Sequence, residues 1–166
     1  MAISTLIELL ERLDEVHLQM LDLAASKKQA IMDNKVDDLI EIMNRESKMV
    51  RQIESLEAQR AEAAYSFLQG VGIRSNLNLN LTELSRLVFD PEEKARLLEV
   101  RDQLSGTLTR LKKAADLNKL LIEQSLAYID YSVDLMVERP NQDVTYQHPA
   151  SRVHEVQRPG FFDARG

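Results

Sequence analysis

The fold is decided by residues 3–33, which read ISTLIELLERLDEVHLQMLDLAASKKQAIMD. Apolar residues recur there at intervals of three and four, so they share one face of a helix. The members of this face are Leu6, Leu9, Leu10, Leu13, Val16, Met20, Leu23, Ala24, Ala30 and Ile31. Acidic residues fall mostly on the other faces. The stretch therefore predicts a long amphipathic helix.

A second helical pattern follows a short polar break at residues 33–38, DNKVDD. Asp and Asn in this break suit a tight turn and a helix N-cap. The apolar positions of the second pattern are Leu39, Ile42, Met43, Met49, Val50, Ile53, Leu56, Ala63, Ala64 and Phe67. Gly70 and Gly72 end it, because glycine readily adopts the left-handed cap. So short a connection predicts an antiparallel hairpin of helices at about residues 3–33 and 37–69.

Two capping signals predict the remaining helices. Asn80 followed by Glu83 fits a capping box, which predicts a short helix at residues 81–89. Asp90-Pro91-Glu92-Glu93 supplies an N-cap oxygen, a proline at the first helical position and carboxylates at the positive helix end. The helix that it opens is expected to span residues 91–138, before Pro140.

The expected fold is therefore all-α. It consists of a long antiparallel helical hairpin, a short helix and a longer third helix, as a three-helix bundle or coiled-coil-like domain over residues 1–138. Residues 139–166 contain three prolines and are mostly polar. That composition predicts an irregular, flexible tail.

The composition argues against several classes of function. The net charge is -6, with acids interleaved among the basic residues, so a nucleic-acid partner is not expected. The chain has no Cys, and its N-terminus lacks the basic and apolar regions of a secretory signal. No apolar run approaches the roughly 20 residues that span a bilayer. We expect a cytoplasmic protein that does not insert into membranes.

Catalytic and metal-binding constellations are not expected either. Of the three His, His148 and His154 lie in the tail, and His17 follows Asp14 on the inward face of the first helix. A di-iron bundle needs such a carboxylate–His pair on two helices, together with further Glu residues. We interpret His17 as a residue at the edge of the core. The sequence predicts no enzyme and no cofactor.

Polar residues also interrupt the buried faces. Glu46 and Arg60 break the apolar stripe of the second helix, and Lys27 is an inward-facing break in the first. If the hairpin turns near Lys35, Glu46 lies about one turn from Lys27. We predict a Lys27–Glu46 pair that fixes the register, since specificity is the best-attested use of such pairs. The alternative is that both side chains extend to water.

The second half of the third helix has more apolar surface than a hairpin can cover. One inward position per heptad changes from leucine (97, 104, 111) to small polar residues at Asn118, Ser125 and Ser132. Its flanking stripes stay apolar, and Leu117, Leu120, Ala127 and Tyr131 form a second apolar edge. This pattern favours a groove for an amphipathic helix of a partner. Cover by the first helix, the tail or a second copy of the chain is the alternative.

A series of motifs extends over nearly the whole chain. It comprises Leu6-Ile7-Glu8-Leu9-Leu10, Val36-Asp37-Asp38-Leu39-Ile40, Ile53-Glu54-Ser55-Leu56-Glu57-Ala58-Gln59-Arg60, Leu81-Thr82-Glu83-Leu84 and the closing Gly160-Phe161-Phe162-Asp163-Ala164-Arg165-Gly166. In order and pattern the chain resembles the FlgN family, the flagellar export chaperones of the hook-associated proteins.

The resemblance implies a cytoplasmic protein that holds unassembled hook–filament junction subunits. It would bind their C-terminal amphipathic helices, prevent premature assembly and deliver them to the flagellar type III export apparatus, without a cofactor. In this family the C-terminal part is associated with substrate capture. The resemblance therefore places partner binding at Leu121, Tyr128, Ile129, Tyr131, Ser132 and Leu135.

Two further hypotheses concern the same surface. Val153, Val156, Phe161 and Phe162 of the tail are expected to fold over the groove as a pseudo-substrate when no client is present. The alternative function is a structural coiled-coil adaptor that oligomerises through this surface. A chaperone is expected to be a monomer or a weak homodimer, whereas the adaptor would be a stable oligomer.

Overall fold

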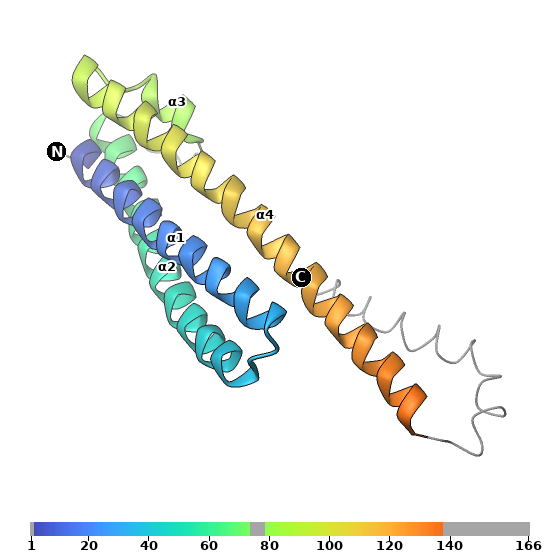
Figure 1. Ribbon diagram of the computed structural model, residues 1–166. Helices are drawn as coiled ribbons and strands as arrows, with labels where there is room; N and C mark the ends of the chain where they lie inside the picture. Colours follow the sequence, from blue (N-terminus) through green and yellow to red (C-terminus); the bar gives the residue numbers. More distant parts are fainter. Residues whose placement is uncertain (1, 74–78, 138–166) are drawn as a thin grey trace, which may run out of the picture. The chain divides into compact units, whose positions relative to one another are not determined.

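The structure is a computed structural model that describes residues 2–73 and 79–137. Within these residues the chain forms helices and no strand (Figure 1). The helices are α1 (Ala2–Met32), α2 (Val36–Gly70), α3 (Leu81–Ser85) and α4 (Pro91–Met136). The all-α prediction, with a hairpin, a short helix and a longer third helix, is confirmed. The predicted tail at residues 139–166 lies outside the described residues.

The chain divides into two compact units, Met1–Glu123 and Gln124–Gly166. The first unit contains α1, α2, α3 and most of α4. The described part of the second unit is the end of α4, at residues 124–137. The predicted division into a bundle over residues 1–138 and a tail remains a prediction.

A left-handed residue closes α1 and starts the hairpin turn. Asn34 has a φ of 54°, and Lys35 N–H donates to the Ala30 carbonyl at 2.9 Å. Asn34 N–H donates to the carbonyl of Ile31 at 3.2 Å, which completes a Schellman motif. Lys35 is the N-cap of α2 and has no side-chain cap hydrogen bond. The prediction of an Asp or Asn N-cap is wrong here, because the turn uses its Asn in the left-handed conformation instead.

The end of α2 repeats this geometry with glycine. Gly72 has a φ of 90° and donates its N–H to the carbonyl of Gln69 at 3.0 Å. Ile73 N–H donates to the carbonyl of Leu68 at 2.9 Å. These two bonds satisfy carbonyls that the helix itself leaves unpaired, as predicted from the glycine positions.

The caps of α3 and α4 follow the local sequence. The Asn80 side chain accepts from Glu83 N–H at 2.8 Å, and Asn80 N–H donates to the Glu83 carboxylate at 3.1 Å. The capping box is thus confirmed. Asp90 Oδ1 accepts from Glu92 N–H at 3.3 Å where α4 begins. However, α3 ends at Ser85 rather than at residue 89. Beyond Ser85 the N–H groups of Leu87 and Val88 donate to the carbonyls three residues earlier, so the chain tightens into a turn in place of a further α-helical turn.

The core of the first unit joins all four helices. One buried cluster contains Leu6, Ile7 and Leu10 of α1 with residues of α2, with Leu84 of α3 and with Leu97 of α4. A smaller cluster lies nearer the hairpin turn and is formed by Leu23, Ala30 and Ile42. Apart from Met20, which is partly buried, every predicted apolar position of α1 is buried.

Three contacts align α1 with the first part of α4. Ser4 donates to Glu93 at 3.2 Å, Arg96 donates to Glu11 at 2.9 Å, and Asn118 donates to the Ala24 carbonyl at 2.9 Å. Because the partner numbers rise together, these segments run parallel. Figure 1 shows α1 beside α2, which runs in the opposite direction.

The polar residues that interrupt the apolar faces of α1 and α2 form two kinds of ion pair, one between the helices and one within α2. Lys27 Nζ lies 3.0 Å from Glu46 Oε1, with 19% and 23% of the two side chains exposed, so the predicted pair is confirmed. Arg60 instead binds Glu57 of its own helix at 2.6 Å. The hydrogen bonds that the Arg60 guanidinium donates to the Glu57 carboxylate raise the pKa of Arg60 above its ordinary value.

Candidate protein-binding surface

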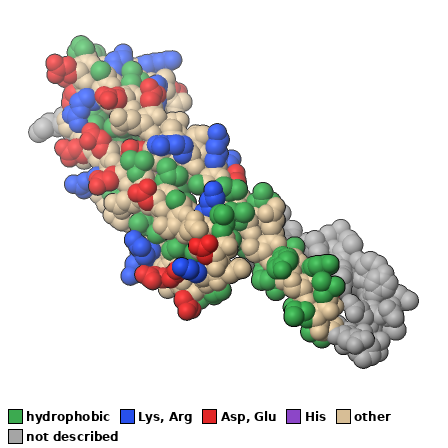
Figure 2. All heavy atoms as spheres, viewed as in Figure 1, with side chains coloured by type: hydrophobic (Ala, Val, Ile, Leu, Met, Phe, Trp, Pro, Cys, Tyr) green, Lys and Arg blue, Asp and Glu red, His purple; other side chains and the backbone are tan. Residues whose placement is uncertain are grey.

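The second unit exposes most of the apolar side chains on its described helix. We call this set the apolar end of α4, and it comprises Leu126, Tyr128, Ile129, Tyr131, Val133, Leu135 and Met136, together with Val137, which directly follows the helix. Tyr128 is 70% exposed and Leu135 is 67% exposed. Figure 2 shows hydrophobic side chains gathered on this part of α4. Contiguous apolar exposure of this kind typically marks an interaction surface.

The sequence-predicted partner residues fall into two groups. Tyr128, Ile129, Tyr131 and Leu135 are exposed, whereas Ser132 is partly buried. Leu121 belongs to the first unit and is also partly buried. Their helical spacing brings Tyr128, Tyr131 and Leu135 onto one side of α4, since positions three, four and seven apart are neighbours. Ile129 lies about 100° around the helix from Tyr128. Their role in partner binding remains a proposal.

The inward stripe of α4 has the burial that the heptad pattern predicts in the first unit. Leu97, Leu104 and Asn118 are buried, and Leu111 is partly buried. The Asn118 side chain donates a hydrogen bond to the α1 backbone, while its buried Oδ1 has no hydrogen-bond partner among the described residues. A small polar residue in this stripe therefore lets the α1 backbone approach within hydrogen-bond distance.

A second exposed apolar stripe lies on α2, and the sequence interpretation missed it. We call it the outer α2 stripe, and it comprises Val36, Ile40, Met43 and Val50. The sequence interpretation grouped Met43 and Val50 with the other apolar positions of the second helix without separating two stripes, and these side chains are 48% and 42% exposed. The signal was present in the sequence, since these four positions follow their own spacing of four, three and seven. Phe89, in the connection before α4, is also exposed.

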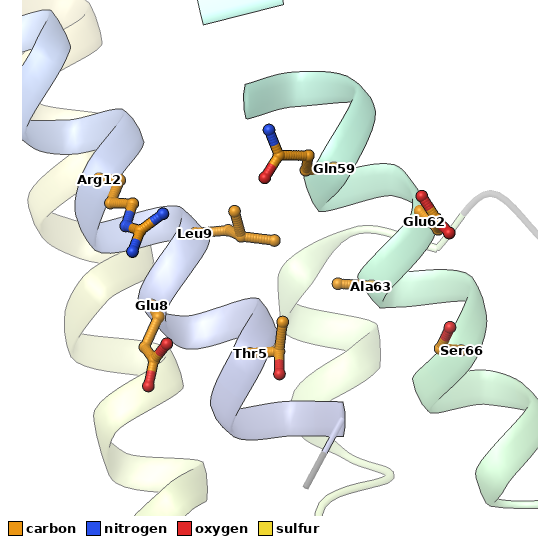
Figure 3. Close-up of a pocket in the computed structure, with 8 residues that line it drawn as sticks. All are labelled: Thr5, Glu8, Leu9, Arg12, Gln59, Glu62, Ala63 and Ser66. Carbon is orange, nitrogen blue, oxygen red and sulfur yellow. The ribbon is translucent and has the colours of Figure 1, made fainter. Parts of the chain in front are cut away.

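A cleft of about 380 Å³ opens between α1 and α2. Figure 3 shows Leu9 and Ala63 facing each other across it, with Arg12, Glu8 and Glu62 around the rim. Leu9 and Ala63 are both buried, and the small Ala63 side chain leaves part of the space unfilled. Most of the rim is exposed and polar. The cleft therefore resembles a surface hollow between two helices more than the apolar pocket of a small-molecule site.

The described residues do not group side chains for metal binding. Within residues 2–73 and 79–137, no three His, Asp or Glu side chains lie together as metal ligands would. His17 Nδ1 lies 2.6 Å from the carbonyl oxygen of Leu13, one turn earlier in α1. It is partly buried, in agreement with the prediction of a residue at the core edge. Among the described helices, none has the length and apolar character that crossing a bilayer requires.

This combination defines a class: over its described residues the protein is all-helical and has exposed apolar helix surface of the kind that typically binds other proteins. Comparison with known proteins then identifies the family within this class. The family described as FlgN protein matches residues 1–153. The chain is also similar to the uncharacterized protein YvyG of Bacillus subtilis (strain 168), with 29% identity over 141 residues, or 85% of this chain and 84% of the relative. No solved structure matches it significantly.

Since the family match covers most of the chain, this protein belongs to the FlgN family. That family consists of flagellar export chaperones and is not a family of enzymes.

Proposed function

We propose that this protein captures the C-terminal amphipathic helices of hook-associated proteins in the cytoplasm. By covering them it prevents premature assembly and aids delivery to the flagellar type III export apparatus. The observation that carries this proposal is the apolar end of α4, which supplies a large exposed surface on a regular element. An amphipathic helix can lay its apolar side along such a surface.

The energetics suit reversible capture. Covering Tyr128, Tyr131 and Leu135 removes two aromatic rings and one leucine from water, and a fully buried apolar side chain contributes roughly 1.5–3 kcal/mol. Association and ordering of side chains offset much of this gain. The net free energy of binding that remains suits a client that must be released for export better than it suits a permanent subunit.

The proposal is tested by calorimetric titration with peptides of the C-terminal helices of the hook-associated proteins from the same organism. We expect saturable one-to-one binding to the wild-type protein. Tyr128→Asp or Leu135→Asp is expected to weaken it at least about tenfold, because a charge then enters the apolar contact; tenfold corresponds to about 1.4 kcal/mol.

A matched control places the same replacement on another element. Tyr65→Asp changes a partly exposed tyrosine of α2 and is expected to leave binding within about twofold. Circular dichroism checks that each variant keeps its helical content. No binding of any of these peptides would contradict the proposed function and leave the oligomeric adaptor as the better explanation.

A further inference from the structure

The outer α2 stripe keeps its pattern when its direction is reversed. It comprises Val36, Ile40, Met43 and Val50, and the exposed Ser47 occupies the position between Met43 and Val50. The last four of these positions are spaced three, four and three residues apart, so the order of the intervals is the same in both directions. A helix face with this property can pack against a second copy of itself in antiparallel orientation.

The charges on one flank of this stripe are ordered as well. The flank is formed by the residues that directly follow the stripe members, about 100° around the helix from them. In chain order these residues are Asp37, Glu41, Asn44, Lys48 and Arg51, and all are exposed. Within the part of the chain that the structure describes, none of the four charged side chains forms an ion pair. The flank therefore begins with two free acids and ends with two free bases.

The charged residues on the other sides of this segment leave that order unchanged. Glu46 lies on the opposite flank and is paired with Lys27 of α1 at 3.0 Å. Asp38 and Arg45 lie on the side of the helix away from the stripe, where they line a cleft with α1. Glu41 lines the same cleft, so it lies at the outer border of the flank.

We propose that the outer α2 stripe binds the same stripe of a second copy of this chain, with the two α2 helices antiparallel. The two-fold axis passes near Asn44, and such an interface brings the same surface of both copies together. In this register Ile40 faces Val50 of the second copy, and Met43 faces its Ser47. The Ser47 hydroxyl donates to the Met43 carbonyl of its own helix at 3.1 Å, so its small side chain is satisfied and leaves room for a methionine. The inference goes beyond the proposed function, since it concerns a different helix.

The charges on the flank select this occupant. In the same register Asp37 lies beside Arg51 of the second copy, and Glu41 lies beside its Lys48. Each contact occurs twice, because the axis repeats it. Charges that border an apolar helix contact set the choice of partner and the orientation, as the flanking positions of coiled coils do.

Other arrangements lack this match. In a parallel pair the acids of one copy would meet the acids of the other, which is unfavourable. In the antiparallel pair Glu54, at the end of the stripe, comes within about one turn of Lys35 of the second copy. An unrelated helix would need bases opposite residues 37–41 and acids opposite residues 48–51, and the reversed stripe supplies both in the required order.

The contact is small, so the dimer is expected to be weak. It involves one helix of each copy and four exposed apolar side chains on each. Stable interfaces bury roughly 1,200–2,000 Å² in total, and a single helix pair falls at or below the lower value. We therefore expect monomer and dimer to exchange over the micromolar range of protein concentration.

The test is sedimentation velocity of the full-length protein from about 1 to 200 μM. Asp37→Lys with Glu41→Lys makes the charged positions of the flank all basic, and Lys48→Glu with Arg51→Glu makes them all acidic. Each double variant alone is expected to weaken self-association at least about tenfold, because like charges then meet. An equimolar mixture of the two is expected to restore the dimer, and so is one chain that carries all four replacements.

A control changes the net charge equally elsewhere. Glu15→Lys with Glu62→Lys replaces two exposed acids of α1 and α2 outside the stripe and is expected to leave self-association within about twofold. Circular dichroism checks that each variant keeps its helical content. A wild-type protein that stays monomeric at every concentration would overturn the proposal. So would an equal loss in the control, a dimer that neither double variant weakens, or a mixture of folded variants that does not associate.

Discussion

The Lys27–Glu46 contact is the residue pair whose contribution to the hairpin can be measured most cleanly. Both side chains are about four-fifths buried, and they join α1 to α2 at 3.0 Å. Ion pairs of this kind lose hydration as they gain attraction, so the net contribution is modest. We predict a coupling free energy of about 0.5–1 kcal/mol between Lys27→Met and Glu46→Gln in a double-mutant cycle on unfolding.

The single variants also carry information. Each single variant leaves one partly buried charged group without its partner. The losses in the free energy of unfolding of the two single variants are therefore expected to add up to more than the loss in the double variant. A coupling indistinguishable from zero would mean that the two side chains only extend toward water side by side. The hypothesis that this pair sets the hairpin register would then be wrong.

At the scale of the element, Gly72 and Gly106 differ in backbone conformation. Gly72 has a φ of 90° at the end of α2, whereas Gly106 lies inside α4, and at either position an added Cβ would meet none of the described residues within 4 Å. Backbone conformation alone therefore decides the effect of alanine. We predict that Gly72→Ala lowers the free energy of unfolding by about 1 kcal/mol, and that Gly106→Ala raises it by about 0.5–1 kcal/mol.

Urea denaturation with a shared m-value measures both changes on one scale. The two variants serve as controls for each other, since both add a single methyl group in open space. A shift in the same direction for both would contradict the account of how α2 ends and α4 continues.

The helices could be predicted from sequence because their signals are local. The capping box at Asn80, the Asp90-Pro91 start of α4 and the glycine end of α2 each act within one turn of chain. The failures are local as well. Asn34 suited both an N-cap and a left-handed turn, and only the second role is used. The capping box marks where α3 begins, but it carries no signal for its end at Ser85.

The surfaces could be predicted only in part, because exposure depends on which neighbour covers each helix. Apolar spacing showed that Met43 and Val50 belong to a stripe, but it does not tell which of two adjacent stripes faces α1. The exposed end of α4 was easier to foresee. Its apolar residues occupy more than one face, and one hairpin cannot cover them all. Asn118 shows that a small polar seam residue can equally serve an internal contact.

At the scale of the whole molecule, the C-terminal residues offer a test of autoinhibition. We propose that Val153, Val156, Phe161 and Phe162 compete with the client for the apolar end of α4. Deleting residues from Asn141 onward is then expected to tighten client binding severalfold, because an intramolecular competitor reduces the apparent affinity of a ligand. Titration of the full chain and the shortened chain with the same peptide measures this ratio.

A control keeps the length of the chain unchanged. Replacing the four apolar residues with Ser is expected to reproduce the effect of the deletion, since the competing contact is apolar. Unchanged or weaker binding after deletion would count against autoinhibition and would leave the tail without this role.

The central claim is that the client helix lies on the apolar end of α4 and not on the outer α2 stripe. Hydrogen–deuterium exchange of the full-length protein, with and without a saturating hook-associated peptide, tests it directly. We predict slower exchange in residues 120–137 and no change in residues 36–50. Protection of residues 36–50 without protection of residues 120–137 would contradict the account and move the client site to α2.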